Sequence, residues 1–331
     1  MKSKAIVFPQ AQEAVIEEVE VGAPAVGQVL IDVGVNHVST GTESFCYRGQ
    51  FEPNTSWSDW VKYPFYPGYS AVGWVAAVGA GVTALKVGER VHCHASHRKL
   101  AVISADHATP IPDGVSDDDA AWSALAGITQ TAIRRAEHLM GDTAVVIGLG
   151  PLGQIVTRYL SAMGLSEILA IDSVASRLDL ALAGGATHAF NGSAADAKPF
   201  VVEYTQGELA DVVYDVTGYF SVLPLALPLA RNFGKVMLLG DSPFPSKQVL
   251  TQDVLARQVA VIGSHNQKLP PNEAKWNNER QLGLFYAYIQ RGRMNLGKLI
   301  THRFRAEQVP QMYEQLRVNR EATLGVVIDW K

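Results

Sequence analysis

Cysteine and net charge are both scarce in this chain, and each shortage excludes classes of protein. The 331 residues hold two cysteines, Cys46 and Cys93, too few for a disulfide-rich scaffold or a four-cysteine zinc site. Charged residues make up 18% and the net charge is -4, whereas a nucleic-acid-binding protein needs a basic surface. We therefore expect no nucleic-acid partner, and the few thiols fit a reducing, cytoplasmic setting.

Long apolar runs are absent as well. No stretch reaches the ~20 apolar residues that span a bilayer. The opening Met1-Lys2-Ser3-Lys4 leads into a short strand-like run and not into a signal peptide. Hydrophobic residues still make up 47%, as in a globular protein, and the length suffices for two domains. We therefore expect no membrane partner.

The stretch from Thr143 to Asp172 combines the parts of a dinucleotide-binding unit. A short apolar run suited to a buried strand leads into three glycines at G-x-G-x-x-G spacing, Gly148, Gly150 and Gly153. These permit a tight turn, close approach of a pyrophosphate, and close packing of the following helix, whose N-terminus attracts phosphate. Because strand, helix, second strand and terminal acid coincide, an ordinary glycine turn is the less favoured interpretation.

The acid at the end of the second strand favours NAD over NADP. The Asp172 carboxylate would accept ribose hydroxyls and repel a 2′-phosphate. Arg177 leaves NADP open, because an arginine there could meet that phosphate. Further cofactor contacts are expected in the glycine loop and after later strands, where ligands bind such sheets: Pro151, Leu152, Thr217, Gly218, Gly240, Gly263 and Ser264.

Two domains of an α/β protein are predicted from the strand and helix patterns. Residues 1–122 hold short β-branched runs typical of a barrel-like domain, and 123–266 alternate strands and helices as in a doubly wound parallel sheet. The six strands expected in that sheet are 144–147, 168–171, 188–191, 212–216, 235–239 and 259–262. Helices are expected at 120–125, 129–139, 177–183, 222–230, 280–290 and 306–319. A last strand, 325–330, has no partner nearby in sequence, so we expect it to return to the first domain.

Motifs along nearly the whole chain resemble the medium-chain dehydrogenase/reductase superfamily. Besides the glycine loop, the markers are Thr40-Gly41-Thr42-Glu43, Pro67-Gly68-Tyr69-Ser70-Ala71-Val72-Gly73, Val87-Gly88-Glu89-Arg90-Val91 and Ile111-Pro112-Asp113-Gly114. The resemblance implies a partly open GroES-like barrel at 1–122 and 267–331 that binds a small-molecule substrate, and a Rossmann domain at 123–266. It also implies a homodimer joined near Gln258–Ile262.

The zinc alcohol dehydrogenases of this superfamily differ from this chain at their metal ligands. They have cysteine where this chain has Thr40, and His-Glu where it has Tyr69-Ser70. Threonine and tyrosine are poor zinc ligands, and a catalytic zinc needs three protein ligands. We therefore expect no zinc. The nearby histidines leave another metal open in principle, although no third ligand is evident: His37, His92, His94 and His97.

Within the superfamily, the chain resembles the zinc-free bacteriochlorophyllide a dehydrogenase branch. The segments that carry this likeness are 38–43, 47–49, 63–69, 299–303 and 326–331. It implies an NAD-dependent enzyme that interconverts a secondary alcohol and a ketone, on a bacteriochlorophyllide-like or other bulky apolar substrate in bacteriochlorophyll biosynthesis. The insertion Phe51 to Val61 departs from the branch, and its Trp57 and Trp60, with Trp276, either line an apolar cleft or pack as core.

Without zinc, side chains must bind the substrate oxygen and move its proton. Tyr69 would hydrogen-bond that oxygen, Thr40 and Thr42 would relay a proton, and Glu43 or His37 would receive it. Each also has a structural alternative as a packed aromatic, a helix cap or a buried barrel histidine. Two rival hypotheses stay open: a zinc-free enoyl or quinone reductase using NAD(P)H, and a nucleotide-bound sensor or structural protein without turnover.

Overall fold

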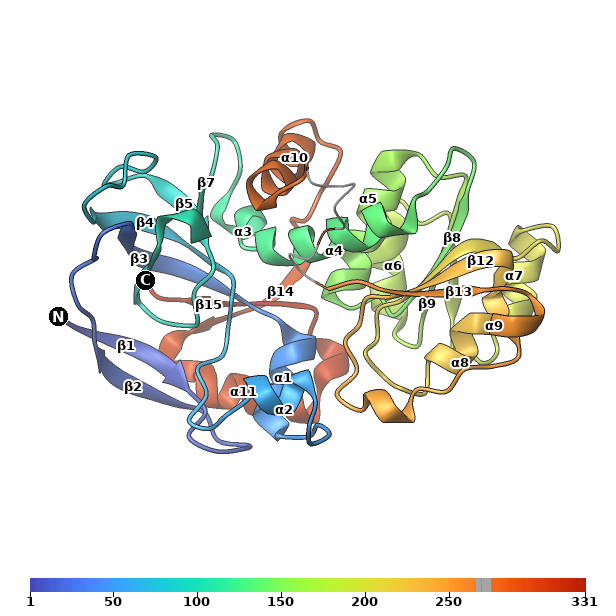
Figure 1. Cartoon of the computed structure of the whole chain (residues 1–331), viewed down its shortest axis with the longest axis horizontal. Helices are drawn as coiled ribbons and strands as arrows, with labels where there is room; N and C mark the ends of the chain where they lie inside the picture. The colour runs from blue at the N-terminus through green and yellow to red at the C-terminus, as the bar shows by residue number, and fades with distance from the viewer. Residues whose placement is uncertain (266–268, 270–274) are drawn as a thin grey trace. The chain divides into compact units, whose positions relative to one another are not determined.

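The computed structural model describes residues 1–265, 269 and 275–331, and the chain forms two compact units (Figure 1). The first comprises Met1–Ala124, Leu282–Gln290 and Leu296–Lys331, and the second comprises Leu125–Gln281 and Arg291–Asn295. The expected boundaries, 1–122 with 267–331 against 123–266, remain a proposal about which segments serve substrate and cofactor.

The first unit contains a seven-stranded sheet and a two-stranded ribbon. The sheet has the order β14-β15-β3-β4-β5-β7, with β6 also paired to β3, and the ribbon joins β1 to β2. The strands are β1 Lys2–Val7, β2 Val15–Glu20, β3 Gln28–Val38, β4 Ala71–Val78, β5 Arg90–Cys93, β6 Leu100–Ser104, β7 Ala108–Pro110, β14 Ile300–Arg305 and β15 Gly325–Asp329. The β-rich first domain predicted from the sequence is thus confirmed.

Strand β15 joins this sheet from the far end of the chain. It pairs antiparallel with β3, so that Val327 lies opposite His37, which confirms the expected return. Its other neighbour is β14, in parallel register, so the expectation of no partner nearby in sequence is wrong. The β14 strand, ITHRFR, alternates half-buried and exposed residues, and its three charged or polar outward positions hide the strand from an apolar pattern.

The second unit contains a six-stranded, wholly parallel sheet with the order β10-β9-β8-β11-β12-β13. The strands are β8 Thr143–Ile147, β9 Glu167–Asp172, β10 His188–Asn191, β11 Ala210–Asp215, β12 Ala230–Leu238 and β13 Ala260–Gly263. All six predicted strands are present, and the near-continuous burial of the central strands β8, β9 and β11 is what a sheet covered on both faces requires. The strand order reverses between β8 and β11, where doubly wound sheets bind ligands.

The α-helices are, in chain order, α1 Thr40–Arg48, α2 Ser56–Trp60, α3 Asp117–Ala120, α4 Ser123–Ala136, α5 Pro151–Met163, α6 Ala175–Ala183, α7 Lys198–Tyr204, α8 Leu223–Ala226, α9 Asp253–Ala256, α10 Asn278–Gln290 and α11 Val309–Val318. In the first unit, α1, α2 and α11 lie together in Figure 1, and α1 contacts α11. None of the helices in the described part of the chain is long and apolar enough to cross a membrane.

Three helix predictions need correction. The stretches 120–125 and 129–139 do not form two such helices, since α3 ends at Ala120 and α4 runs from Ser123 to Ala136. The predicted helix 222–230 is shorter: α8 passes into a 3₁₀ turn, Leu227–Leu229, and β12 begins at Ala230. Pro228 explains this, because its ring clashes with the carbonyl one turn earlier and it has no N–H to donate.

Candidate functional site

The glycine loop after β8 has the geometry that a dinucleotide fold requires. Gly148 has a φ of +92°, and a Cβ there would lie 2.8 Å from Thr217 Cγ2. A Cβ on Gly153 would lie 2.0 Å from the Gly148 carbonyl oxygen, so only glycine lets α5 approach the strand. At Gly150, by contrast, a Cβ would meet nothing within 4 Å. The middle glycine therefore faces open space, as expected where a pyrophosphate must approach.

Helix α5 begins directly after this loop. Gly150 is its N-cap residue, with no side-chain cap, and Pro151 occupies the first turn. The first N–H groups of a helix have no partner within it, so the backbone of Leu152 and Gly153 is available to an anion at the positive end of the helix dipole.

Asp172 ends β9 beside the loop and is buried. Its Oδ2 accepts the N–H of Leu149 at 2.6 Å, and its Oδ1 accepts the N–H of Val174 at 2.8 Å. A carboxylate has about four lone-pair sites, so two remain for ribose hydroxyls. Arg177 Nη1 lies 4.0 Å from Asp172 Oδ2. The residue that favours NAD, Asp172, and the residue that leaves NADP open, Arg177, are therefore neighbours.

The remaining cofactor candidates lie at the carboxyl ends of neighbouring strands. Gly218 and Gly240, after β11 and β12, pack so closely that a Cβ on Gly240 would lie 2.2 Å from the Gly218 nitrogen. Gly263 ends β13, and the N–H of Ser264 donates to Leu238 at 3.0 Å. Thr217 lies against Gly148. The predicted cofactor residues therefore all lie near the carboxyl ends of the strands of the parallel sheet.

In the first unit, the residues predicted to take over the role of zinc lie in or near the N-terminus of α1. The Tyr69 hydroxyl donates to Ser39 Oγ at 2.6 Å and is also hydrogen-bonded to Thr42. Burial raises the Tyr69 pKa to about 12, with the negative charge of Glu43 adding to the shift. The half-buried Tyr69 hydroxyl is therefore a protonated hydrogen-bond donor across the physiological range.

The Glu43 carboxylate, one turn into the same helix, accepts three hydrogen bonds. Its Oε1 accepts the N–H of Ser39 at 2.8 Å, and its Oε2 accepts from His97 Nε2 at 2.9 Å and from the Tyr313 hydroxyl at 2.6 Å. Burial alone would raise the Glu43 pKa, but the His97 charge and the three hydrogen bonds outweigh it, and the pKa lies below its usual value. The carboxylate is ionised, and three of its about four acceptor sites are occupied by donors.

His37 and Thr40 lie near this cluster, but no hydrogen bond joins their side chains to Tyr69 or Glu43 among the described residues. Burial lowers the His37 pKa to about 4, so the ring is neutral at pH 7, and it packs against Trp122 with centroids 4.3 Å apart. Its Nε2 has no partner among the described residues. Thr40 is buried at the first position of α1, where its carbonyl accepts from Ser44 Oγ at 2.6 Å.

Two of the four histidines considered as metal ligands, His92 and His97, make side-chain hydrogen bonds. Ser70 Oγ donates its only hydrogen to the Ala121 carbonyl at 2.8 Å, so the 3.0 Å contact between Ser70 Oγ and His92 Nε2 must be donated by His92. Burial lowers the His92 pKa well below its usual value. Within 1–265, 269 and 275–331, no three His, Cys, Asp or Glu side chains group as a metal site would need.

The tryptophans of the insertion separate into two roles. Trp57 is 4% exposed and packs edge-on against Phe45 in the core between α1 and α11. Trp60 is 49% exposed and rests on Phe65. Trp276, in the second unit, stacks under the Arg134 guanidinium, 3.4 Å from the ring centroid. Only Trp60 thus presents a large aromatic surface to solvent from the inserted loop.

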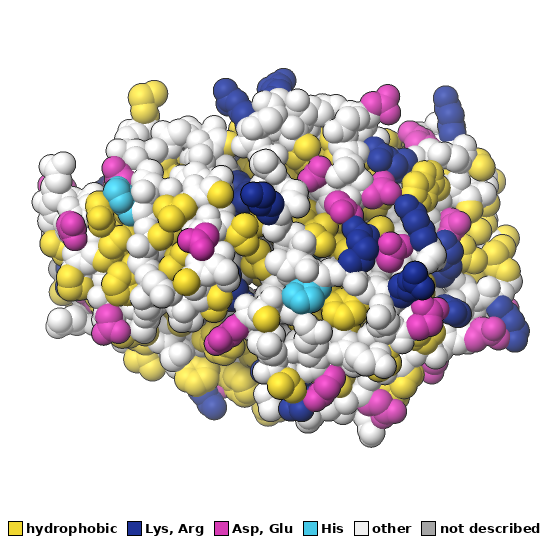
Figure 2. Space-filling model, turned by 180° about the vertical axis from the view of Figure 1, so that it is seen from behind, with side chains coloured by type: hydrophobic (Ala, Val, Ile, Leu, Met, Phe, Trp, Pro, Cys, Tyr) yellow, Lys and Arg dark blue, Asp and Glu magenta, His cyan; other side chains and the backbone are white. Residues whose placement is uncertain are grey.

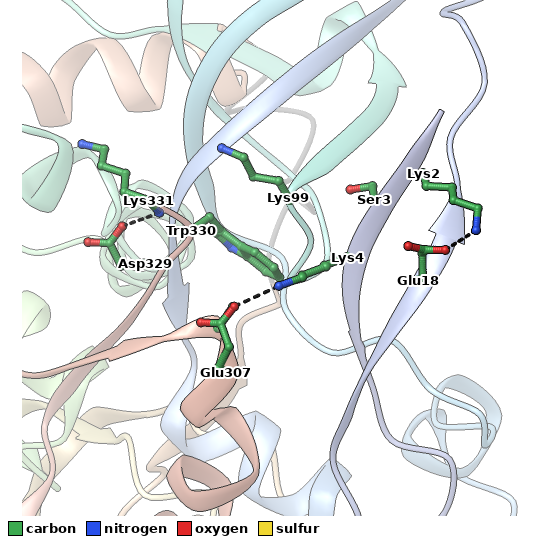
Figure 3. A pocket seen from close by; sticks show the side chains of 10 residues that line it. Lys2, Ser3, Lys4, Glu18, Lys99, Glu307, Asp329, Trp330 and Lys331 are labelled. Carbon is green, nitrogen blue, oxygen red and sulfur yellow. Dashed lines mark hydrogen bonds and ion pairs between the residues drawn. The ribbon is translucent and has the colours of Figure 1, made fainter.

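A charged hollow of about 390 Å³ lies elsewhere in the first unit, around Trp330 (Figure 3). Lys4 pairs with Glu307 at 3.0 Å, and Lys2 pairs with Glu18. Figure 2 shows basic side chains gathered over this unit with acidic ones among them. Because Lys2 and Lys4 pair with carboxylates of the same wall and Lys99 pairs with Asp32, the hollow places no strong demand on the charge of a ligand.

Three residues of the cluster around Tyr69 escaped the sequence analysis in these roles: Ser39, His97 and Tyr313. Ser39 adjoins the Thr40 motif and could have been included by position. His97 and Tyr313 reach Glu43 from 54 and 270 residues away in sequence, and no local pattern carries such contacts.

Comparison with known proteins gives two matching family models. The model described as "Alcohol dehydrogenase GroES-like domain" matches residues 18–140, and "Zinc-binding dehydrogenase" matches residues 151–280. An L-threonine 3-dehydrogenase of Anaeromyxobacter sp. (strain K) is 28% identical over 99% of each chain. The starvation-sensing protein RspB of Escherichia coli K12 is 25% identical over 92% of this chain and 93% of its own.

Solved structures agree on the fold. A dehydrogenase (rspB) from E. coli CFT073 complexed with NADH has a TM-score of 0.83 at 22% identity, covering 99% of both chains. The 2R,3R-butanediol dehydrogenase of Bacillus subtilis has a TM-score of 0.82 at 20% identity, covering 99% of this chain and 100% of its own. With the matched family models and the glycine-loop geometry, the chain belongs to the medium-chain dehydrogenase/reductase superfamily of NAD(P)-dependent oxidoreductases.

Proposed function

We propose that this chain is a zinc-independent, NAD-dependent dehydrogenase that interconverts a secondary alcohol and a ketone. The observation that carries the cofactor part is the glycine loop with Asp172, whose carboxylate keeps two acceptor sites after binding Leu149 and Val174. Gly150 and the first turn of α5 would hold the pyrophosphate, and Asp172 would hold the ribose. The nicotinamide of the bound cofactor supplies the hydride acceptor or donor.

Zinc independence is supported by the chemistry of the donor set. At the positions where zinc ligands stand in related enzymes, this chain offers the hydroxyls of Thr40, Tyr69 and Ser70, and Ser70 already donates to Ala121. Hydroxyl side chains do not replace the Cys, His or carboxylate ligands of a catalytic zinc. Side chains would therefore bind the substrate oxygen and move its proton.

Tyr69 then takes over the contact with the substrate oxygen. Its pKa of about 12 keeps the hydroxyl protonated, and its one hydrogen is donated to Ser39 Oγ. The Tyr69 oxygen can therefore accept the O–H of a bound alcohol, and donation to a ketone oxygen requires that hydrogen to turn away from Ser39. Thr42, hydrogen-bonded to Tyr69, and Thr40, at the start of α1, provide the hydroxyls of a relay. Glu43 and His37 remain predicted end points of that relay, but the three donors on Glu43 and the low His37 pKa favour supporting roles.

The substrate class is proposed only as a secondary alcohol. The relatives named L-threonine 3-dehydrogenase and 2R,3R-butanediol dehydrogenase act, by their names, on small secondary alcohols. A bacteriochlorophyllide-like substrate rests on resemblance alone, and with Trp57 in the core only Trp60 of the insertion offers an exposed aromatic face. L-Threonine, 2R,3R-butanediol and a hydroxyethyl chlorin are therefore the three substrates to compare.

The test combines cofactor binding with turnover of these alcohols. Titration of NADH and NADPH fluorescence should give tighter NADH binding, and Tyr69→Phe should lower kcat/KM at least ~10-fold, about 1.4 kcal/mol, without changing NADH affinity. A Tyr69→Phe variant within about twofold of wild type would refute the role of the hydroxyl. Reduction of an enone with NADPH would instead favour the reductase hypothesis, and NADH binding without any turnover would favour the sensor.

A homodimer and a cytoplasmic location complete the proposal. Strand β13 is the last strand of the parallel sheet, and an open sheet edge invites pairing with another copy. The pairing near Gln258–Ile262 that the family resemblance implies would use this edge. Sedimentation should then give twice the chain mass of 35.8 kDa, and a single-chain mass would remove the proposed pairing.

A further inference from the structure

Three donors converge on the Glu43 carboxylate, two of them from distant parts of the first unit. The Ser39 N–H precedes α1, His97 lies between β5 and β6, and Tyr313 belongs to α11. Because the carboxylate is ionised, it only accepts, so the hydrogens must be carried by His97 Nε2 and the Tyr313 hydroxyl. Glu43 is 1% exposed and therefore holds its charge only while these donors stay in place.

His97 also supports the backbone that carries Tyr69. Its ring lies against Gly68, where a Cβ would fall 2.4 Å from His97 Nδ1, and Gly68 has a φ of +94°. The backbone N–H of His97 donates to the Pro67 carbonyl at 2.8 Å. His97 is 0% exposed, so its imidazole forms a fixed wall behind the Pro67-Gly68-Tyr69 turn.

The same contacts reach the Tyr69 hydroxyl from its other side. Glu43 binds the Ser39 N–H, and Ser39 Oγ accepts from Tyr69 at 2.6 Å. Ser39 occupies the N-cap position of α1 without making a side-chain cap, so its hydroxyl serves Tyr69 and not the helix. His97 thus contacts both ends of the arrangement, the turn that bears Tyr69 and the carboxylate that holds its hydrogen-bond partner.

We propose that His97 is a positioning residue for the reaction at Tyr69, holding the Tyr69 hydroxyl on Ser39 through its hydrogen bond to Glu43 and its packing on Gly68. The proposal rests on the proposed function, in which Tyr69 contacts the substrate oxygen. His97 itself is 0% exposed behind the turn, so it would act through Glu43 and Gly68 and not by direct contact with the substrate.

The kinetic test compares two substitutions of His97 with a matched control. His97→Leu removes the donor to Glu43, and His97→Gln keeps an N–H donor there. With 2R,3R-butanediol or L-threonine, His97→Leu should lower kcat ~10-fold while KM stays within about twofold, and His97→Gln should recover kcat to within ~3-fold of wild type.

The control is His138→Leu in the second unit. His138 is likewise buried and contacts a carboxylate, Asp142, at 3.2 Å and a tyrosine hydroxyl, Tyr214, at 2.7 Å. The His138→Leu variant should lose thermal stability as His97→Leu does, but its kcat should stay at the wild-type value. Equal losses of kcat in both variants, or no rescue by His97→Gln, would show that His97 acts only on stability and overturn the proposal.

A crystal structure of His97→Leu separates this inference from the proposed function. We expect the 2.6 Å bond between Tyr69 and Ser39 Oγ to be lost in His97→Leu and kept in His97→Gln. Persistence of that bond in His97→Leu refutes the positioning role whether or not any alcohol is turned over. Conversely, loss of the bond in a protein that oxidises none of the tested alcohols upholds the positioning and rejects the proposed function.

Discussion

Replacing Asp172 with alanine should reverse the cofactor preference, and the structure gives the size of the effect. A hydrogen bond from a ribose hydroxyl to an ionised carboxylate contributes about 1.5–3 kcal/mol, so its loss should weaken NADH binding roughly 10- to 100-fold. Arg177 Nη1, 4.0 Å from Asp172 Oδ2, would no longer share its charge with a carboxylate. Removal of the repulsion and redirection of Arg177 should strengthen NADPH binding ~10-fold, about 1.4 kcal/mol.

The assay is fluorescence titration of NADH and NADPH with folded protein, checked by thermal unfolding because Asp172 also accepts two backbone N–H groups. Asp179→Ala is the matched control, since Asp179 is exposed on α6 and its replacement removes the same negative charge. The double variant Asp172→Ala/Arg177→Ala should lose the gain for NADPH. If Asp172→Ala changes NADH affinity less than about twofold, Asp172 does not bind the ribose.

Three further outcomes follow from single sites. Gly150→Ala should fold with a stability within about 1 kcal/mol of wild type yet bind NADH at least ~10-fold more weakly, whereas Gly153→Ala should unfold at markedly lower temperature, because its Cβ would lie 2.0 Å from the Gly148 oxygen; equal melting temperatures would contradict this. The His37 pKa falls from 6.5 to about 4 on folding, so the unfolded chain binds the extra proton. Its contribution to stability is complete above pH 6.5 and is lost as the pH falls toward 4, by up to about 3 kcal/mol. His37→Gln should flatten urea-unfolding stability over that window, and an unchanged slope would show that His37 does not titrate there. Because the Tyr69 pKa is about 12, kcat/KM should show no alkaline decline due to Tyr69 below about pH 10, and a decline that Tyr69→Phe abolishes would contradict the protonated hydroxyl.

The second unit was predictable from the sequence because its signals are local. The apolar run, the three glycines and Asp172 lie within one strand-helix-strand unit, in which Gly153 packs on Gly148 and Asp172 accepts from Leu149. The errors also have local causes. Pro228 ended a helix that its apolar neighbours favoured, and the polar outward positions of β14 hid a strand.

The first-unit cluster was predictable only in part. Thr42, Glu43 and Tyr69 could be chosen because they occupy motif positions, and the structure joins them through Ser39. Their environment could not be predicted, since His97 and Tyr313 come from a loop and a C-terminal helix. Those two donors change the expected chemistry of Glu43 from a proton acceptor to an anion stabilised by hydrogen bonds, which only tertiary structure could reveal.

The central claim, that hydroxyl side chains do the work of zinc, is tested most directly by measuring metal content and turnover on the same sample. The protein is exhaustively dialysed against a chelator, zinc is counted by mass spectrometry, and NAD-dependent oxidation of 2R,3R-butanediol and L-threonine is assayed. We predict full activity at well below ~0.1 zinc per chain and no gain on adding zinc, because hydroxyl side chains stand at Thr40, Tyr69 and Ser70. Activity that disappears with the metal and returns with added zinc would contradict the account.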